Sequence, residues 1–161
     1  MRRLIAVIGA WFMVHGGLAQ TFTLERQTDS LYILKLATDS MQNQWRLPYP
    51  VYRMETGDVD GNGSTDALVG VIKRTRYYPD IARRLFIFKN YEGLIRPMWL
   101  GSKLGGTLHD FHFRNGCVRS LESNAKGEYF VVEYRWNGFG MGFERYLIKN
   151  VDETKAREIF E

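Results

Sequence analysis

Gly57–Val71 reads GDVDGNGSTDALVGV and contains the most informative residues of the 161-residue chain. Oxygen-bearing side chains occupy positions 1, 3, 5 and 9 of the predicted loop: Asp58, Asp60, Asn62 and Asp66. A glycine, Gly63, stands at position 6. Calcium and other hard cations bind oxygen ligands at alternating positions of a loop that bends at a glycine. An apolar run typical of a buried strand follows. The stretch therefore predicts a cation-binding loop that leads into the core.

Two other interpretations apply to the same residues. An EF-hand requires a bidentate Glu at position 12, which here is Val69, and it requires flanking helices, which the sequence does not predict. A metal-free turn stays an alternative, because Asn, Asp and Gly favour turns in any case. Three aspartates within nine residues repel one another in the absence of a cation, and this repulsion favours the metal.

The rest of the chain has the pattern of an all-β, antiparallel domain. Apolar residues occur in short alternating runs that Gly, Asn, Asp and Pro interrupt. We expect strands near residues 31–37, 42–47, 50–56, 66–74, 83–90, 94–99, 108–114, 117–122, 127–136 and 142–150. The tail, Glu153–Phe160, is expected to form a final strand or a short helix.

The chain also resembles itself. Leu31–Trp45 (LYILKLATDSMQNQW) aligns without gaps on Leu85–Trp99 (LFIFKNYEGLIRPMW) at an offset of 54 residues. A weaker third copy begins at Tyr146–Asn150 (YLIKN). Upstream of these segments, Asp66–Val71 (DALVGV) matches Glu128–Glu133 (EYFVVE) at a spacing of 62 residues. Each unit is expected to be a hairpin that closes on a tryptophan, with two further strands before it.

Repeats of this length and strand content indicate blade-like units of four strands, at about residues 31–99 and 100–160. Propellers usually have about four to eight blades, and this chain has room for two units and a fragment. We therefore expect a partial or small β-propeller-like fold, with a curved β-sandwich as the alternative. A chance similarity between two ordinary hairpins would also explain the alignment.

The acidic stretch resembles the calcium loop of FG-GAP or VCBS repeats, the blade units of integrin alpha-chain propellers and of many secreted bacterial proteins. The family pattern is D-x-D-G-[DN]-G-x-x-D, followed by an apolar strand. The resemblance implies a structural calcium ion with these ligands: Asp58, Asp60, Asn62, Ser64 through its backbone carbonyl, and Asp66. The second unit departs from the pattern, because Arg114–Glu128 lacks the alternating carboxylates. One calcium site is expected.

The N-terminus has the three regions of a secretory signal. Arg2 and Arg3 precede an apolar segment, Leu4–Val14, and small residues follow at Gly17–Ala19. Cleavage after Ala19 would leave residues 20–161 as a single domain, and a buried N-terminal strand or helix is the alternative. No cysteine follows the small residues, so a lipid anchor is not expected. The chain is predicted to be secreted, in the periplasm or at the cell surface.

Composition narrows the functions further. The chain has 22 basic and 18 acidic residues, and loss of Arg2 and Arg3 with the signal leaves 20 basic residues, a net charge of +2. This small excess does not favour nucleic-acid binding. No later stretch is apolar for long enough to span a bilayer. Cys117 is the only cysteine, so the domain has no internal disulfide and must depend on its core, on bound metal, or on both.

An aromatic and glycine-rich segment, Trp136–Phe143 (WNGFGMGF), is predicted to form a hairpin tip. Its rings, Trp136, Phe139 and Phe143, either form a stacking platform for a sugar or peptide or fold back onto the core. The core position is favoured, because most aromatic residues of a small β domain are buried.

A basic segment, Lys73–Arg84 (KRTRYYPDIARR), is predicted to be a long hairpin loop. Arg76, Tyr77 and Tyr78 are its candidate contacts to an acidic glycan or an anionic protein surface. A solvated loop without a partner is the more common outcome for such a segment.

No catalytic residue is predicted. His109 and His112 are expected to point to opposite faces of a strand, and the chain has no H-E-x-x-H or G-x-S-x-G motif. Cys117 lacks the sequence context of a nucleophile. Glu122 and Glu128 have the chemistry of a glycosidase pair, but the sequence does not define their separation.

These observations favour a calcium-stabilised, propeller-like binding module without catalytic activity. Its expected partner is a protein or a glycan of the cell envelope, with no nucleic acid and no integral membrane segment after signal cleavage. Two alternatives stay open. One is a secreted glycan-active hydrolase or accessory domain, and the other is a structural element that completes a larger propeller by assembly. The oligomeric state is not predicted.

Overall fold

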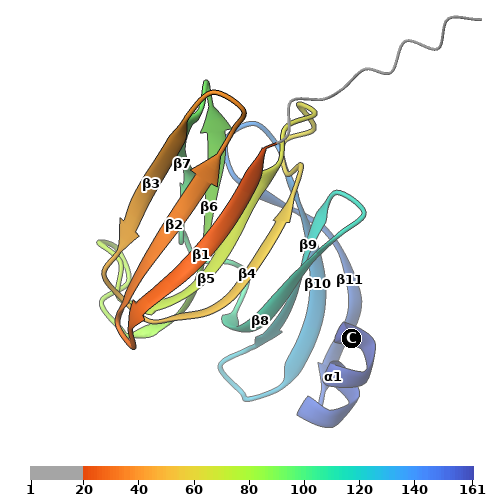
Figure 1. Cartoon of the computed structure of the whole chain (residues 1–161). Helices are drawn as coiled ribbons and strands as arrows, with labels where there is room; N and C mark the ends of the chain where they lie inside the picture. Colours follow the sequence, from red (N-terminus) through yellow and green to blue (C-terminus); the bar gives the residue numbers. More distant parts are fainter. Residues whose placement is uncertain (1–19) are drawn as a thin grey trace, which may run out of the picture.

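The computed structural model describes residues 20–161, so the predicted signal segment lies outside the described residues. These residues form three antiparallel sheets and a C-terminal helix (Figure 1). The first sheet contains β1 (Thr21–Thr28), β2 (Leu31–Ala37) and β3 (Gln42–Leu47). The second contains β4 (Val51–Gly57), β5 (Asp66–Lys73), β6 (Ala82–Tyr91) and β7 (Leu94–Leu100). The third contains β8 (Thr107–Arg114), β9 (Cys117–Ser123), β10 (Tyr129–Trp136) and β11 (Met141–Val151), and α1 (Glu153–Phe160) follows it.

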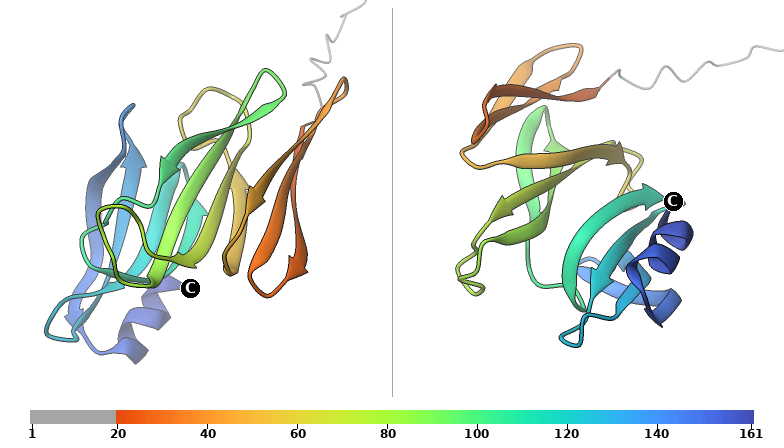
Figure 2. Two further views of the ribbon diagram at one scale, coloured as in Figure 1. Left: turned by 90° about the vertical axis from the view of Figure 1, so that its left-hand side faces the viewer. Right: turned by 90° about the horizontal axis from the view of Figure 1, so that it is seen from below.

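The three sheets lie face to face in chain order, as neighbouring blades do (Figure 2). Each sheet is a meander of consecutive strands, and the chain passes from the last strand of one sheet to the first strand of the next. The prediction of an all-β fold of antiparallel blade-like sheets is confirmed. The described residues form no closed barrel.

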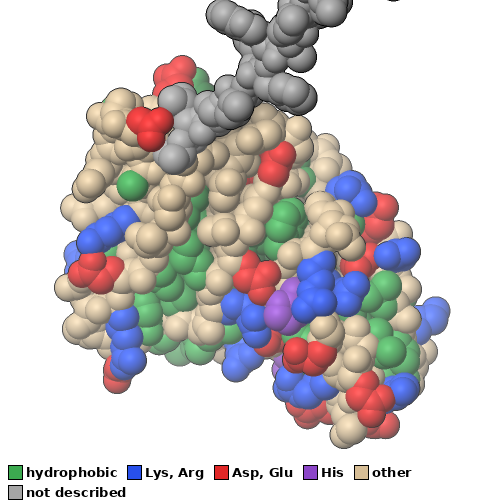
Figure 3. All heavy atoms as spheres, turned by 45° about the vertical axis from the view of Figure 1, so that its right-hand side comes forward, with side chains coloured by type: hydrophobic (Ala, Val, Ile, Leu, Met, Phe, Trp, Pro, Cys, Tyr) green, Lys and Arg blue, Asp and Glu red, His purple; other side chains and the backbone are tan. Residues whose placement is uncertain are grey.

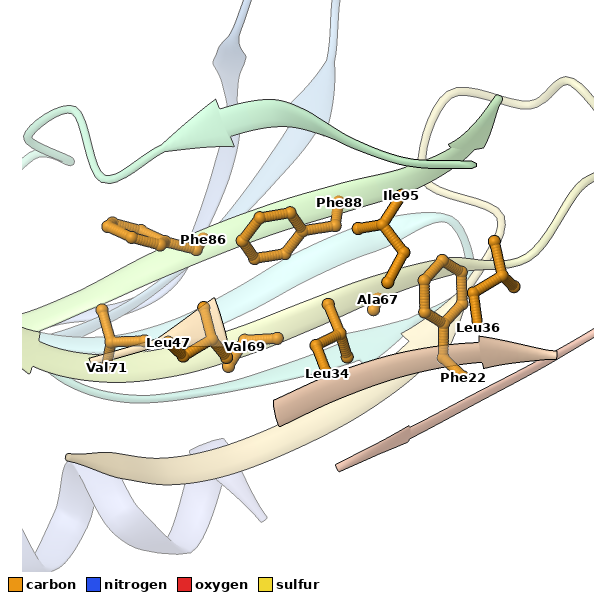
Figure 4. Close-up of a cluster of buried hydrophobic side chains, with 10 residues drawn as sticks. All are labelled: Phe22, Leu34, Leu36, Leu47, Ala67, Val69, Val71, Phe86, Phe88 and Ile95. Atoms are coloured by element: carbon orange, nitrogen blue, oxygen red, sulfur yellow. The ribbon is translucent and has the colours of Figure 1, made fainter. Parts of the chain in front are cut away.

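The second sheet is the centre of the stack because both of its faces are buried. On β5, Ala67, Val69 and Val71 pack toward the first sheet, whereas Leu68 packs toward the third. This alternation explains why β5 is apolar at nearly every position. Figure 4 shows the core between the first two sheets, where Phe88 is fully buried.

The core between the second and third sheets contains Leu68 and Ile87 on one side and Phe111 and Val118 on the other. Gly70 on β5 allows an aromatic ring to lie directly on the strand. A Cβ atom at this position would come within 2.5 Å of the Tyr52 ring. A larger residue would therefore displace Tyr52 from the core.

The two outer faces of the stack do not offer an apolar surface to a fourth sheet. The outer face of the first sheet carries the apolar Ile33 and Ala37 but mainly polar side chains: Thr23, Glu25, Lys35, Gln42 and Gln44. The outer face of the third sheet is covered by α1, whose Ala156 and Phe160 pack on Leu121 and Val131. Asp152 caps this helix by accepting a hydrogen bond from the Lys155 backbone at 2.9 Å.

The strand bounds agree closely with the sequence prediction, with one omission. The sequence did not indicate β1, whose residues (TFTLERQT) are mostly polar. β1 lies at the edge of its sheet, so it buries Phe22 and exposes most other residues. The uncertain tail, Glu153–Phe160, forms α1.

The internal alignment is correct in part. Leu31–Trp45 and Leu85–Trp99 form equivalent hairpins, β2–β3 and β6–β7. The other two matches align strands that occupy different positions in their sheets. Tyr146–Asn150 lies in β11, the last strand of its sheet, whereas the segment it matches lies in β6, a third strand. Glu128–Glu133 lies mainly in β10, although the strand equivalent to β5 in the third sheet is β9. Period-2 patterns of apolar residues are similar in all strands and do not identify a strand's position.

Candidate functional site

The acidic loop, residues 58–66, connects β4 to β5 at one end of the stack, where Figure 1 shows it in yellow. Gly57, the last residue of β4, pairs with Asp66, the first residue of β5. The two ends of the loop are therefore fixed by neighbouring strands of the second sheet. Gly63 has a φ of +84°, in the left-handed region that favours glycine. The sequence prediction of a tight, glycine-bent loop ahead of a core strand therefore agrees with the structure.

Three carboxylates converge inside this loop. Asp58, Asp60 and Asp66 each offer one oxygen atom, and these atoms lie within 4.8 Å of one another. Among residues 20–161 this is the only group of three or more His, Cys, Asp or Glu side chains so arranged. Hard cations prefer such oxygen donors.

Of the three carboxylates, that of Asp66 has the environment that least favours a negative charge. It is fully buried, and its Oδ2 accepts a hydrogen bond from the Val59 backbone at 2.9 Å, whereas its Oδ1 has no hydrogen-bond partner. Burial, together with the negative charges of Asp60 and Asp58, raises the pKa of the Asp66 carboxyl to about 6. A buried carboxylate oxygen without a donor is costly, and a cation in the loop would remove that cost.

The other two predicted ligands have different roles in the structure. The Asn62 Oδ1 accepts a hydrogen bond from the Ser64 backbone at 2.7 Å. The backbones of Asn62 and Gly63 donate to the carboxylate of Asp58, at 3.0 Å and 2.8 Å. These bonds are those of an Asx-type turn, so the turn and the carboxylate cluster coexist. A turn alone does not explain the unpartnered oxygen of Asp66, and a calcium-like cation fits this donor set.

The aromatic tip divides into a buried part and an exposed part. Trp136 is half-buried and packs on the core between the second and third sheets. Phe139 is 95% exposed at the β10–β11 turn, and the backbones of Phe139 and Gly140 donate to Asn137 Oδ1. Phe143 is also exposed, and its ring centroid lies 5.0 Å from that of Tyr146. The preference for a core position is therefore correct only for Trp136.

The basic loop, Lys73–Arg84, connects β5 to β6 at the opposite end of the stack from the acidic loop (Figure 1). Arg76 and Tyr77 are exposed, and Tyr78 is half-buried. The aromatic tip, at the β10–β11 turn, lies at the same end of the strands as the acidic loop (Figure 1). It is therefore at the other end from the basic loop, and the two predicted contact surfaces do not form one site.

The two histidines depart from the expected alternation. A bulge in β8 between Leu108 and Asp110 changes the phase of the strand at His109. His109 consequently packs on Tyr129, and His112 stacks on Phe160, so both rings lie on the face that α1 covers. They bind separate partners, Ser123 at 2.8 Å and Glu55 at 2.7 Å.

A cluster of charged side chains that the sequence did not indicate connects β4 to β8. Arg53 donates two hydrogen bonds to Asp110, at 2.7 Å and 2.8 Å, and Glu55 accepts from the Phe113 backbone at 2.6 Å. Figure 3 shows histidine, acidic and basic side chains gathered on this face. The partners lie 57 to 59 positions apart in the chain, so no local pattern reveals them. These charge-assisted hydrogen bonds join two sheets, and the Nε2 of His112 is buried beside them without a hydrogen-bond partner.

The other catalytic candidates are also engaged in the fold. Glu122 is fully buried and accepts hydrogen bonds from Ser120 and the Gly106 backbone, both at 2.5 Å, and burial raises the pKa of its carboxyl. Glu128 accepts from Asn124 at 2.8 Å. Cys117 is buried, which raises the pKa of its thiol.

Comparisons with protein-family models, with curated proteins and with solved structures find no match to this chain. The one helix of residues 20–161, α1, has eight residues and is too short to cross a bilayer.

Proposed function

We propose that the protein is a secreted, non-catalytic binding module whose acidic loop holds one structural calcium ion. The observation that carries the calcium assignment is the unpartnered, buried Oδ1 of Asp66 beside the carboxylates of Asp58 and Asp60. These three side chains would supply the charged ligands, and Asn62 and Ser64 follow from the resemblance to FG-GAP loops.

The position of the loop supports a structural role for the ion. Asp66 is the first residue of β5, the strand whose side chains enter both cores. Calcium would neutralise the repulsion among three carboxylates and fix the start of this strand. Since the unfolded chain lacks the assembled ligands, the binding free energy would add to the free energy of unfolding.

Binding is favoured over catalysis because His109 Nε2, His112 Nδ1 and Glu122 each hold a hydrogen bond within the fold. The alternative of a larger propeller completed by assembly receives less support. Its additional sheets would have to pack on the polar face of the first sheet or on α1. An interface of that kind would not bury the apolar area that joins the present sheets.

Isothermal calorimetry with calcium on residues 20–161 tests the assignment. We expect a single site with a dissociation constant on the order of 10⁻⁴ to 10⁻³ M or tighter, as in extracellular modules. Asp60→Ala should weaken binding at least about ten-fold, because it removes one of three charged ligands. Asp80→Ala removes an exposed carboxylate from the basic loop at the opposite end of the stack; it is the matched control and should leave binding unchanged. No heat of binding at millimolar calcium would contradict the proposal.

A further inference from the structure

The basic loop concentrates positive charge that the fold leaves unpaired. Five basic residues lie in or beside the β5–β6 connection: Lys73, Arg74, Arg76, Arg83 and Arg84. Asp80 is the only acidic residue of this segment. Ten ion pairs occur within residues 20–161, and none of them includes any of these five. The segment therefore has a net positive charge, and its five cations form no ion pair with the other described residues.

Aromatic rings hold four of the five cations in place. Lys73 lies 4.4 Å above the Tyr49 ring centroid and Arg83 lies 4.6 Å above that of Tyr52. Two further stacks lie within the loop itself, Arg76 on Tyr77 at 5.6 Å and Arg84 on Tyr78 at 5.3 Å. A guanidinium that stacks on a ring directs its in-plane N–H groups away from the ring. Arg83 and Arg84 each donate one of these N–H groups to a backbone carbonyl, of His109 and of Asp80. The arginines are thus oriented before any partner arrives.

Apolar side chains project from the same loop. Tyr77 is 78% exposed and Ile81 is 65% exposed. An amphipathic ring and an aliphatic side chain beside arginines are typical of segments that contact a lipid surface, where the cations meet phosphates and the apolar groups enter the headgroup region. An acidic polysaccharide would use the arginines and Tyr77 but would have no use for Ile81.

The charge at the acidic-loop end of the stack favours one orientation of the protein on an anionic surface. The loops at the acidic-loop end contain Asp39, Asp58, Asp60 and Glu92, and they contain no Lys or Arg. The acidic-loop end is therefore acidic whereas the basic loop is positive, and an anionic surface would repel the first and attract the second.

We propose that the basic loop binds the surface of an anionic lipid bilayer, with the arginines on lipid phosphates and with Tyr77 and Ile81 at the headgroup level. This names a partner for the proposed binding module that differs from the expected protein or glycan. It rests on the binding role but not on the calcium site, which lies at the other end of the stack. Attachment of this kind is peripheral and involves no membrane-spanning segment.

Co-sedimentation of residues 20–161 with vesicles tests the inference. Vesicles of phosphatidylcholine alone should retain little protein, and vesicles with about 30% phosphatidylglycerol should retain it at low salt and release it at high salt. Arg74→Gln/Arg76→Gln should weaken binding about thirty-fold, as expected for the loss of two surface cations. The control, Arg96→Gln/Arg114→Gln, removes the same charge from exposed positions outside the loop and should change binding less than about three-fold.

A second variant separates a lipid surface from a soluble polyanion. Ile81→Ser keeps the charge and should weaken vesicle binding about five-fold, whereas binding to heparin should not change. Equal binding of wild type and Ile81→Ser to vesicles, or no difference between the two double variants, would overturn the proposal. The calorimetry described above reports on calcium separately, so failure of either proposal is recognisable without the other.

Discussion

In calcium-free buffer, the free energy of unfolding of the wild type, relative to that of Asp66→Asn, should fall by about 3 kcal/mol as the pH rises from about 4 to above 6. The cause is the buried carboxyl of Asp66, whose pKa rises from 3.8 to about 6 in the folded protein. Each unit of pKa difference between the folded and unfolded states corresponds to about 1.4 kcal/mol.

The direction of this change in the free energy of unfolding follows from the proton that the folded protein keeps on Asp66. Between pH 3.8 and about 6 the folded protein keeps a proton on Asp66 that the unfolded chain has already released. The stabilising contribution of this proton is complete below the pKa that Asp66 has in the unfolded chain. It is lost as the pH rises through the pKa that Asp66 has in the folded protein. Urea unfolding at a series of pH values, with a chelator present, measures this slope.

Calcium should offset most of this loss, because the ion binds the ionised carboxylates and is most effective above pH 6. At a concentration one hundred times the dissociation constant it should add about 2.7 kcal/mol. Asp66→Asn provides the control: in chelator it should be more stable than the wild type at pH 7 and should lack this pH dependence. A wild type whose stability increases over the same pH range in chelator would refute the account of Asp66.

Phe88→Ala should lower the free energy of unfolding by about 3 to 5 kcal/mol, the usual cost of a large cavity in a packed core. Phe88 is fully buried between the first and second sheets, and its ring lies 5.7 Å from that of Trp45. Chemical unfolding followed by tryptophan fluorescence measures the change, because Trp45 reports directly on this core.

Phe139→Ala is the matched control, since it removes the same ring from a position that is 95% exposed. It should alter the free energy of unfolding by no more than about 0.5 kcal/mol. A large loss in this variant would show that the aromatic tip contributes to the core in solution. Equal effects of the two substitutions would contradict the face-to-face packing of the sheets.

Local sequence patterns predicted the parts of the structure that depend on neighbouring residues. Strand bounds depend on alternating apolar residues and on turn residues, so β2 to β11 were indicated to within a few positions. The acidic loop was also visible, because all of its carboxylates lie within nine consecutive residues. The polar edge strand β1 has neither signal.

The features that the sequence did not reveal depend on partners far apart in the chain. Arg53 meets Asp110 only because β4 and β8 lie side by side across two sheets. The common face of His109 and His112 depends on a bulge, and a single inserted residue changes every later side chain of the strand. The burial of Asp66, which supports the proposed metal site over a simple turn, depends on the packing around β5 and not on the loop sequence.

The burial of the second sheet on both faces has a consequence for local opening. Each outer sheet contacts one face of the second, but only the third is also packed against a helix, so the first sheet can detach while the core between the second and third sheets stays closed. Amide hydrogen exchange should therefore be slowest at Leu68 and Ile87 and faster along β1, which also lies at an edge. The chain would then behave as two cooperative units of unequal stability, with the strand that begins at the acidic loop as the last to exchange.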